Sequence, residues 1–455
     1  MHHIIPSPSI SQNGAEGKAT HNNPDPFYTR IALYLPPVIA AYVLLAMATP
    51  LSADFIGNFV NPTEMQTQAI LQTGLYAPWH FCMKLYYGFL LSAGLAPVTQ
   101  PSDVIGIWYF QSSPNAYLLV LALKLPIIIF TLASGALIYL LDRRLGAAAN
   151  RASVAMLQWL ANPLVIITTV MWGTWDVVAL FFTLISLMLI CRGKAVLSGV
   201  SLFVAFAIKV IPIILLPVYL VYLYRTSKRG LLRFTATFAV LFAVGAVGAL
   251  WLGGERLASA VGKVFSFYFP YFAGVTLDAG LFQLSSTVVA LSLLVLFAAR
   301  LWRFQKETTL IDLVLAYLLV FFALAFWHPH YLVYLMAFLA IRYGTTTSHR
   351  LTYLTIVLTA LGTSLIVFGF YFSSWGHSVL FIPNYTATMQ ALSSFILMLP
   401  GDPIAQPVGV VLHSLFAAAC LYYAVMLFLP KPSGELRFRL LTKEEGDRDK
   451  RGQQP

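Results

Sequence analysis

The stretch AYLLVLALKLPIIIFTLASGALIYLL, residues 116–141, decides the fold class. Its one charged residue is Lys124, and it exceeds the roughly 20 apolar residues with which a helix crosses the hydrocarbon core of a bilayer. The whole chain agrees with this segment, because 59% of its 455 residues are hydrophobic and only 10% are charged. Soluble domains carry about 25% charged residues. The sequence therefore predicts a polytopic membrane protein and excludes a water-soluble globular one.

Twelve apolar stretches predict an all-α fold of about twelve transmembrane helices. Residues 1–30 are expected to form a polar cytosolic segment, without the apolar core of a cleavable signal peptide. Residues 31–429 are expected to form the transmembrane domain, and residues 430–455 a charged cytosolic tail. The predicted spans are 31–49, 116–141, 152–172, 176–191, 195–208, 210–224, 234–252, 281–299, 310–327, 330–342, 351–372 and 408–429.

Basic residues predict the orientation of these spans. With both termini in the cytosol, 23 of the 28 lysines and arginines fall on the cytosolic side, as the positive-inside rule requires. The net charge of +11 is then explained by the basic residues that orient the protein in the membrane. Nucleic acid is therefore not expected as a partner. We expect a multi-pass protein of the cell (plasma) membrane.

The loops on the opposite side are longer and carry most of the candidate site residues. In the first of them, residues 80–95 are apolar but interrupted by Lys84, which favours a helix lying in the membrane interface over a thirteenth span. Asp54 follows the first predicted span almost directly. A carboxylate at that position can act as a base at the lipid surface, with Glu64 as a second candidate; a helix cap or an exposed loop acid is the alternative for Asp54.

Two lysines are predicted within the membrane, in its external half. Lys124 lies inside the second predicted span, and Lys209 lies where two spans meet. Burying a lysine at the centre of a membrane helix costs roughly 2.5–3.5 kcal/mol on insertion scales. Each lysine can instead extend its ammonium group to the interface. Both lysines lie on the external side, where the positive-inside rule expects few cations. Two cations there are also consistent with binding of an anion such as a lipid phosphate.

Asp176 ends the segment WLANPLVIITTVMWGTWD, residues 159–176. Asn162-Pro163 should loosen a turn of the third span, since proline removes a backbone donor and clashes with the preceding turn. Gly173 then allows the chain to reverse. Asp176 is expected either to cap the next helix or to form part of a cavity wall.

His328 and His330 flank Pro329 at an external turn. Their spacing suits a loop better than a helical metal pair, and no metal is expected. The alternatives are hydrogen bonding at the interface and contact with a phosphate or a sugar. The three cysteines, Cys82, Cys191 and Cys420, predict neither a disulfide framework nor a metal site.

Four segments resemble the GT-C superfamily of integral-membrane glycosyltransferases, and in particular mannosyltransferases related to the first GPI mannosyltransferase. They are LALKLPIIIFTLASGALIYLLDRRLG, WLANPLVIITTVMWGTWDVVALFFTL, GVSLFVAFAIKVIPIILLP and FFALAFWHPHYLVYLMAFL. Relatives commonly carry Gly-Asn-Ala-Asp or Gly-Gln-x-Asp where this chain has Gly-Thr-Trp-Asp, so the acid is kept and the amide is lost.

The resemblance implies an inverting glycosyltransferase with a GT-C-like fold and an extracytoplasmic active site. It would transfer a hexose, with mannose expected, from a polyprenyl- or dolichyl-phosphate sugar to a lipid- or protein-linked acceptor, a glycolipid or glycan, without a cofactor. Asp54 would be the general base, with Glu64 as backup, and Asp176 would orient the acceptor or the sugar. The donor phosphate would be bound by Lys124, Lys209, His328 and His330.

Two other classes share this topology. A secondary transporter would show half-to-half similarity and charged pairs near the midplane, whereas the predicted ionisable groups gather at the external face. A lipid-linked glycan polymerase or ligase usually relies on arginines in a large external loop, and Arg256 is the one arginine predicted there.

Overall fold

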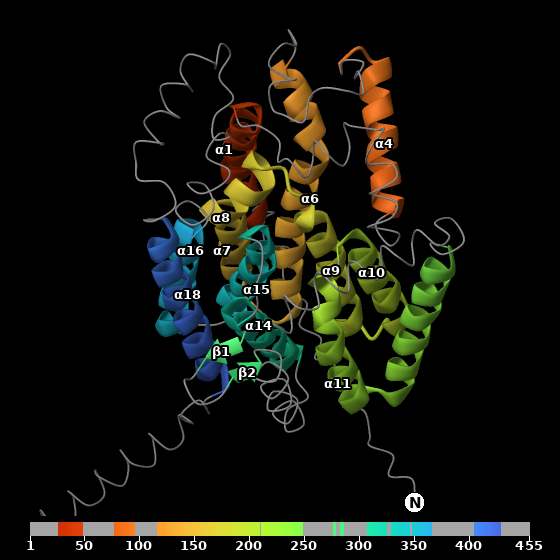
Figure 1. Ribbon diagram of the computed structural model, residues 1–455, viewed down its shortest axis with the longest axis vertical. Helices are drawn as coiled ribbons and strands as arrows, with labels where there is room; N and C mark the ends of the chain where they lie inside the picture. Colours follow the sequence, from red (N-terminus) through yellow and green to blue (C-terminus); the bar gives the residue numbers. More distant parts are fainter. Residues whose placement is uncertain are drawn as a thin grey trace, which may run out of the picture.

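The computed structural model of this chain is an assembly of packed helices with one small two-stranded sheet (Figure 1). It describes residues 26–48, 77–95, 116–209, 211–248, 276–278, 283–285, 307–324, 329–345, 348–365 and 405–428. The first half contains α1 (Pro26–Ala48), α4 (Ala77–Ser92), α6 (Ala116–Arg144), α7 (Ala149–Leu160), α8 (Pro163–Val165), η1 (Ile166–Met171), α9 (Asp176–Cys191), α10 (Ala195–Ile208), η2 (Ile211–Leu215), α11 (Leu216–Thr226) and the helix Lys228–Gly248. The second half contains β1 (Thr276–Asp278), β2 (Gln283–Ser285), α14 (Glu307–Leu324), η3 (Pro329–Tyr331), α15 (Leu332–Thr345), α16 (His349–Ser364) and α18 (Ala405–Phe428).

Two of the described helices, Leu118–Arg144 and Lys228–Gly248, are long and apolar enough to cross a membrane alone. A third crossing is added if Ala149–Leu160 and Pro163–Met171, which are bent by 42°, count as one span. The remaining apolar helices of the described part have 10–17 residues. The helical membrane character is therefore confirmed, and the count of twelve spans is not.

One predicted span begins with a different structure. Residues 283–285, at the start of the predicted span 281–299, form β2, which pairs antiparallel with β1 through Thr276 and Ser285. The helix prediction is wrong for these three residues. Gln283 and Ser285 interrupt the apolar run, and the ladder to β1 supplies their backbone with partners.

The predicted helix in the first external loop is present as α4. Its apolar face, with Met83, Tyr87 and Leu90, is buried in the core cluster of the helices, and the Tyr86 hydroxyl donates to the Ala122 carbonyl of α6 at 2.7 Å. Figure 1 shows α4 standing alongside α6 rather than crosswise to it. The helix thus packs beside its neighbours α6 and α10, and its predicted place in the membrane interface stays a prediction.

The third predicted span is broken at Asn162-Pro163, as expected. The Asn162 Oδ1 atom accepts hydrogen bonds from the backbone of Leu164 at 2.9 Å and Val165 at 3.4 Å, and Pro163 begins α8 where no backbone donor is needed. The chain continues as the π-helix η1 and then turns at Gly173, whose φ is +68°. The side chain of Asn162 thus replaces the backbone partners that the break removes.

Buried side-chain hydrogen bonds join α9 to α10. The hydroxyls of Ser186 and Ser198 each donate to the backbone carbonyl of the other residue at 2.9 Å, and Ser201 donates to Phe182 at 2.7 Å. Small hydroxyl residues allow two apolar helices to approach closely and give them polar contacts inside the membrane. These contacts align α9 and α10 as an antiparallel hairpin.

The helix α15 lies in the centre of the bundle, with almost every residue buried. Arg342, near its end, is itself buried, and its Nε atom pairs with the Asp312 carboxylate of α14 at 2.8 Å. Arg342 is the last residue of the predicted span 330–342, and the structure uses it to neutralise the acid of the neighbouring helix.

The contact between α6 and α15 depends on the absence of a side chain at Gly344. A methyl group there would overlap the buried carboxylate of Asp142. Gly344→Ala is therefore expected to lower the free energy of unfolding by about 1–3 kcal/mol, as overpacking in a core does. Thermal unfolding of the purified chain in detergent measures this change.

Gly88 provides the matched control for this substitution. It is exposed within α4, and nothing lies within 4 Å of a methyl group added to it. Gly88→Ala should leave the melting midpoint unchanged or raise it, because alanine favours a helix over glycine by about 1 kcal/mol. Equal midpoints for the two variants would contradict the tight contact at Gly344.

Candidate functional site

Two side chains that are distant in sequence, Lys209 and His330, lie close to the carboxylate of Asp176. The Asp176 Oδ2 atom lies 3.9 Å from Lys209 Nζ and 3.7 Å from His330 Nε2. The Asp176 side chain is 1% exposed, against 17% for Lys209 and 12% for His330. We call Asp176, Lys209 and His330 the charged cluster.

Helix ends bring the charged cluster together. Asp176 is the first residue of α9, and Lys209 directly follows α10 in an extended conformation, with φ −152° and ψ 142°. Because α9 and α10 form a hairpin, the start of one helix lies beside the end of the other. His330 comes from η3, which precedes the central helix α15.

Aromatic rings surround the lysine of the cluster. The Lys209 Nζ atom lies 5.3 Å from the centre of the Trp175 ring and 5.6 Å from that of Tyr331. The His330 and Tyr331 rings meet edge to face, with 4.5 Å between their centres. Cations at this distance from ring faces are attracted by the ring quadrupole. The rings also shield the cluster from water, which strengthens its electrostatic interactions.

The role of Asp176 as a helix cap is not supported. The N-cap position of α9 is Trp175, with no side-chain hydrogen bond at the cap, and Asp176 occupies the first turn. An acid there still interacts favourably with the positive end of the helix dipole. Its carboxylate lies beside Lys209 and His330, and a cavity wall at this position stays a prediction.

The two ion contacts are longer than direct hydrogen bonds. At 3.7 Å and 3.9 Å, they exceed the roughly 2.7–2.9 Å of a charge-assisted hydrogen bond. Lys209 and His330 can therefore approach another anion without first breaking a short hydrogen bond to Asp176. A protonated His330 would give the charged cluster a net charge of +1.

Lys124 contacts the end of η1, which leads into the turn before Asp176. It is completely buried in α6, and its Nζ atom donates to the carbonyls of Met171 at 2.6 Å and Ala46 at 3.2 Å. These carbonyls belong to the ends of η1 and α1, so Lys124 joins three helices and supports the turn that leads to Asp176. Its contact with a donor phosphate stays a prediction, because the described contacts are to backbone.

Other candidate residues lie outside the described part of the chain. These are Asp54, Glu64 and His328, so their predicted roles stay predictions. Within the described residues, no group of three or more His, Cys, Asp or Glu side chains could hold a metal ion. The sequence did not single out Trp175 and Tyr331, although each directly neighbours a predicted site residue.

The fold and the charged cluster define a helical membrane protein with buried charge at one end of its helices. Residues 104–260 match the family described as GPI transamidase subunit PIG-U. PIG-U is a family of membrane proteins related to GT-C-like proteins. The match covers about a third of the chain and includes Lys124, Asp176 and Lys209, but not His330. No curated protein matches the chain.

The contact between Asp176 and Lys209 can be tested by a double-mutant cycle. Lys209→Met and Asp176→Asn should each lower the melting midpoint in detergent, because each leaves a buried charge with less compensation. The double variant should be less destabilised than the sum of the single variants, with a coupling of about 0.5–3 kcal/mol.

A remote lysine provides the control for this cycle. Lys194 lies beyond the other end of α9, whose 16 residues rise by about 24 Å. Asp176→Asn combined with Lys194→Met should therefore give additive changes. Additive changes for the Asp176 and Lys209 pair as well would show that the two side chains are not coupled.

Proposed function

We propose that this chain binds a phosphate-linked sugar lipid at the charged cluster and transfers the sugar as an inverting glycosyltransferase. The single observation that carries the proposal is the meeting of Lys209 and His330 around the buried Asp176. The donor class is a polyprenyl- or dolichyl-phosphate hexose, with mannose expected. The acceptor is a lipid- or protein-linked glycan.

In this proposal the charged cluster binds the donor phosphate. A phosphate between Lys209 and His330 would exchange with the long contacts to Asp176 and gain charge-assisted hydrogen bonds. As the bond from the sugar to the phosphate breaks, negative charge develops on the leaving phosphate, and fixed cations stabilise that charge in the transition state. Asp176, released from the cations, would then orient a hydroxyl of the sugar or the acceptor.

The general base and the class of acceptor are assigned from the resemblance to glycosyltransferases. Asp54, or Glu64 in its place, would take the proton of the acceptor hydroxyl as general base. The acceptor oxygen then forms a bond to the anomeric carbon while the bond to the phosphate oxygen breaks, so the configuration inverts. The phosphate leaves as an anion and needs no separate acid.

The sidedness of this reaction follows the distribution of charge. The ends of α6 and α9 that carry Arg143, Arg144 and Arg192 lie opposite the charged cluster. The positive-inside rule assigns this basic end to the cytosol. The proposal therefore places the charged cluster at the extracytoplasmic face of the plasma membrane, with both termini in the cytosol.

A second candidate function is a glycolipid-binding subunit without transferase activity. The match of residues 104–260 to a family described as a GPI transamidase subunit favours it. The same charged cluster would then hold the phosphate of a glycolipid and present it to a partner subunit. This candidate needs Lys209 and His330 but no general base.

Lys209→Ala tests the phosphate contact that both candidates share. The purified chain in proteoliposomes is titrated with polyprenyl-phosphate mannose. Affinity should fall by roughly tenfold or more, because a hydrogen bond to a charged group contributes about 1.5–3 kcal/mol. Arg151→Ala, which removes an exposed cation of α7, should leave donor affinity unchanged. Unchanged affinity in folded Lys209→Ala would exclude Lys209 from the site.

Asp54→Asn separates the two candidates. If Asp54 is the general base, transfer of labelled mannose should fall by roughly 100-fold or more, while donor binding stays intact. Glu64→Gln measures the alternative base in the same assay. Undiminished transfer by folded Asp54→Asn would remove Asp54 from this role. Donor binding by the unmodified chain without any transfer would favour the non-catalytic subunit.

A further inference from the structure

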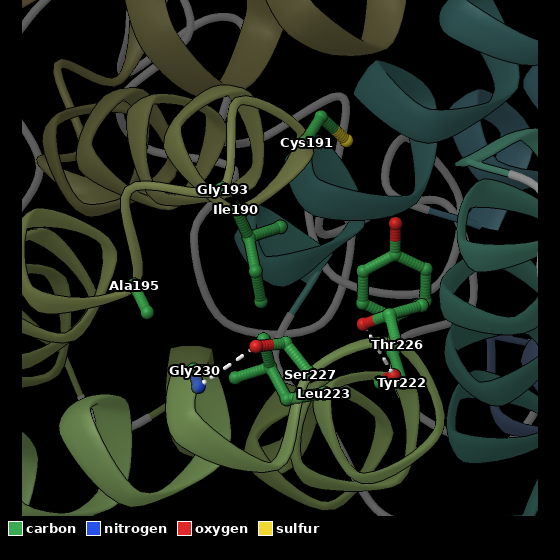
Figure 2. Close-up of a pocket in the computed structure, with 9 residues that line it drawn as sticks. All are labelled: Ile190, Cys191, Gly193, Ala195, Tyr222, Leu223, Thr226, Ser227 and Gly230. Atoms are coloured by element: carbon green, nitrogen blue, oxygen red, sulfur yellow. Dashed lines mark hydrogen bonds between the residues drawn. The ribbon is translucent and has the colours of Figure 1, made fainter. Parts of the chain in front are cut away.

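We propose that a cavity at the basic end of the helices binds the phosphate head group of an anionic membrane phospholipid. The cavity has a volume of about 230 Å³ and lies between two turns of the chain (Figure 2). One turn, residues 190–195, joins α9 to α10, and the other, residues 222–230, joins α11 to the helix Lys228–Gly248. The cavity is at the opposite end of α9 from Asp176, so this proposal is independent of the proposed glycosyl transfer.

The two turns concentrate positive charge at the cavity. Their sequences are CRGKA, residues 191–195, and RTSKRG, residues 225–230, and neither contains an acid. The four cations that are exposed there are Arg192, Lys194, Lys228 and Arg229, with Arg225 half-buried beside them. Arg144 adds another cation, because its Nη2 atom donates to the Cys191 carbonyl at 3.0 Å. An anion is the ligand that this charge favours.

The cavity itself offers a hydrogen-bond donor between apolar walls. Ile190, Ala195 and Leu223 form apolar parts of the wall. Ser227 lies beside Leu223 in Figure 2, with Ile190 on the other side of the cavity, and its Oγ atom accepts a hydrogen bond from the Gly230 backbone at 3.0 Å. The hydroxyl hydrogen of Ser227 can then donate to an oxygen of the ligand. A phosphate oxygen in the cavity would accept from this hydroxyl, while the cations of the two turns adjoin the residues that line the cavity.

The surroundings of the cavity favour a lipid over a free phosphate ion. Large apolar side chains next to both turns are exposed, namely Val196, Leu197, Tyr224 and Leu232. Acyl chains can lie along them while the head group enters the cavity. The cavity is also smaller than the roughly 300–1,000 Å³ of a pocket for a drug-sized molecule. It therefore has room for a head group and not for the whole lipid.

The positive-inside rule explains why these turns are basic, but not why they enclose a cavity. Diffuse attraction to an anionic membrane needs only exposed charge. A specific site predicts in addition that filling the cavity removes binding while every charge remains. The two explanations can therefore be separated by substitution.

The test measures lipid binding by the full-length chain, purified in a neutral detergent. Native mass spectrometry counts bound lipid during titration with phosphatidylglycerol, phosphatidylcholine or inorganic phosphate, and melting midpoints are followed in parallel. Phosphatidylglycerol should bind and raise the midpoint, and phosphatidylcholine should bind at least tenfold more weakly. Inorganic phosphate binding as tightly as phosphatidylglycerol would overturn the assignment to a lipid.

Two matched pairs of substitutions test the charge. Lys194→Gln/Lys228→Gln should weaken phosphatidylglycerol binding roughly 25-fold, since each cation near a membrane surface contributes about fivefold. Arg143→Gln/Arg151→Gln removes the same charge from exposed residues outside the cavity and should leave binding within twofold of the unmodified chain. An equal loss in both pairs would overturn the site in favour of diffuse attraction.

Ser227→Phe tests the cavity with all charges in place. The exposed position of Ser227 tolerates a larger side chain, and the ring would occupy the space that the head group needs. Binding should fall at least tenfold, whereas Ser227→Ala, which removes only the hydroxyl, should lose less. Binding of phosphatidylglycerol by Ser227→Phe at the affinity of the unmodified chain would overturn the proposal.

Discussion

The arrangement of the candidate site depends on how the structure satisfies the backbone groups exposed by a broken helix. In a membrane, a polar backbone group without a partner is costly, so each must find one within the protein. The break at Asn162-Pro163 removes such partners. The Asn162 side chain replaces them at one end. At the other end, Lys124 donates to the carbonyl of Met171. The turn at Gly173 and the position of Asp176 follow from these contacts.

The ends of the α9–α10 hairpin differ in charge and therefore in what they can bind. At one end, the acid of Asp176 is held between Lys209 and His330 and shielded by aromatic rings. At the other, cations surround a small cavity without any acid in the adjoining turns. The helices keep these two regions apart, since the 16 residues of α9 rise by about 24 Å. Binding at either end is thus free to occur without direct contact with the other.

Much of the local structure could be predicted from the sequence, since it depends on neighbouring residues. The break at Asn162-Pro163, the reversal at Gly173 and the long helix around Lys124 are of this kind. The partners of Arg342 and α4 could not be predicted, because they lie far away in the sequence. Arg342 pairs with Asp312 on another helix, and Tyr86 of α4 donates a hydrogen bond to the Ala122 carbonyl of α6. Neither partner is visible in a local pattern of hydropathy.

The sequence by itself determined the helical membrane class and the separation of basic residues from the polar candidates, because hydropathy and charge act residue by residue. Only the tertiary structure decided which candidates meet. It joined Asp176 and Lys209 through a hairpin and added His330 from a segment more than a hundred residues later. In the tertiary structure, Lys124 donates hydrogen bonds to backbone carbonyls of two other helices. A cavity also forms between two basic turns. Such contacts depend on the packing of helices, which follows from shape and hydrogen bonding between segments remote in sequence.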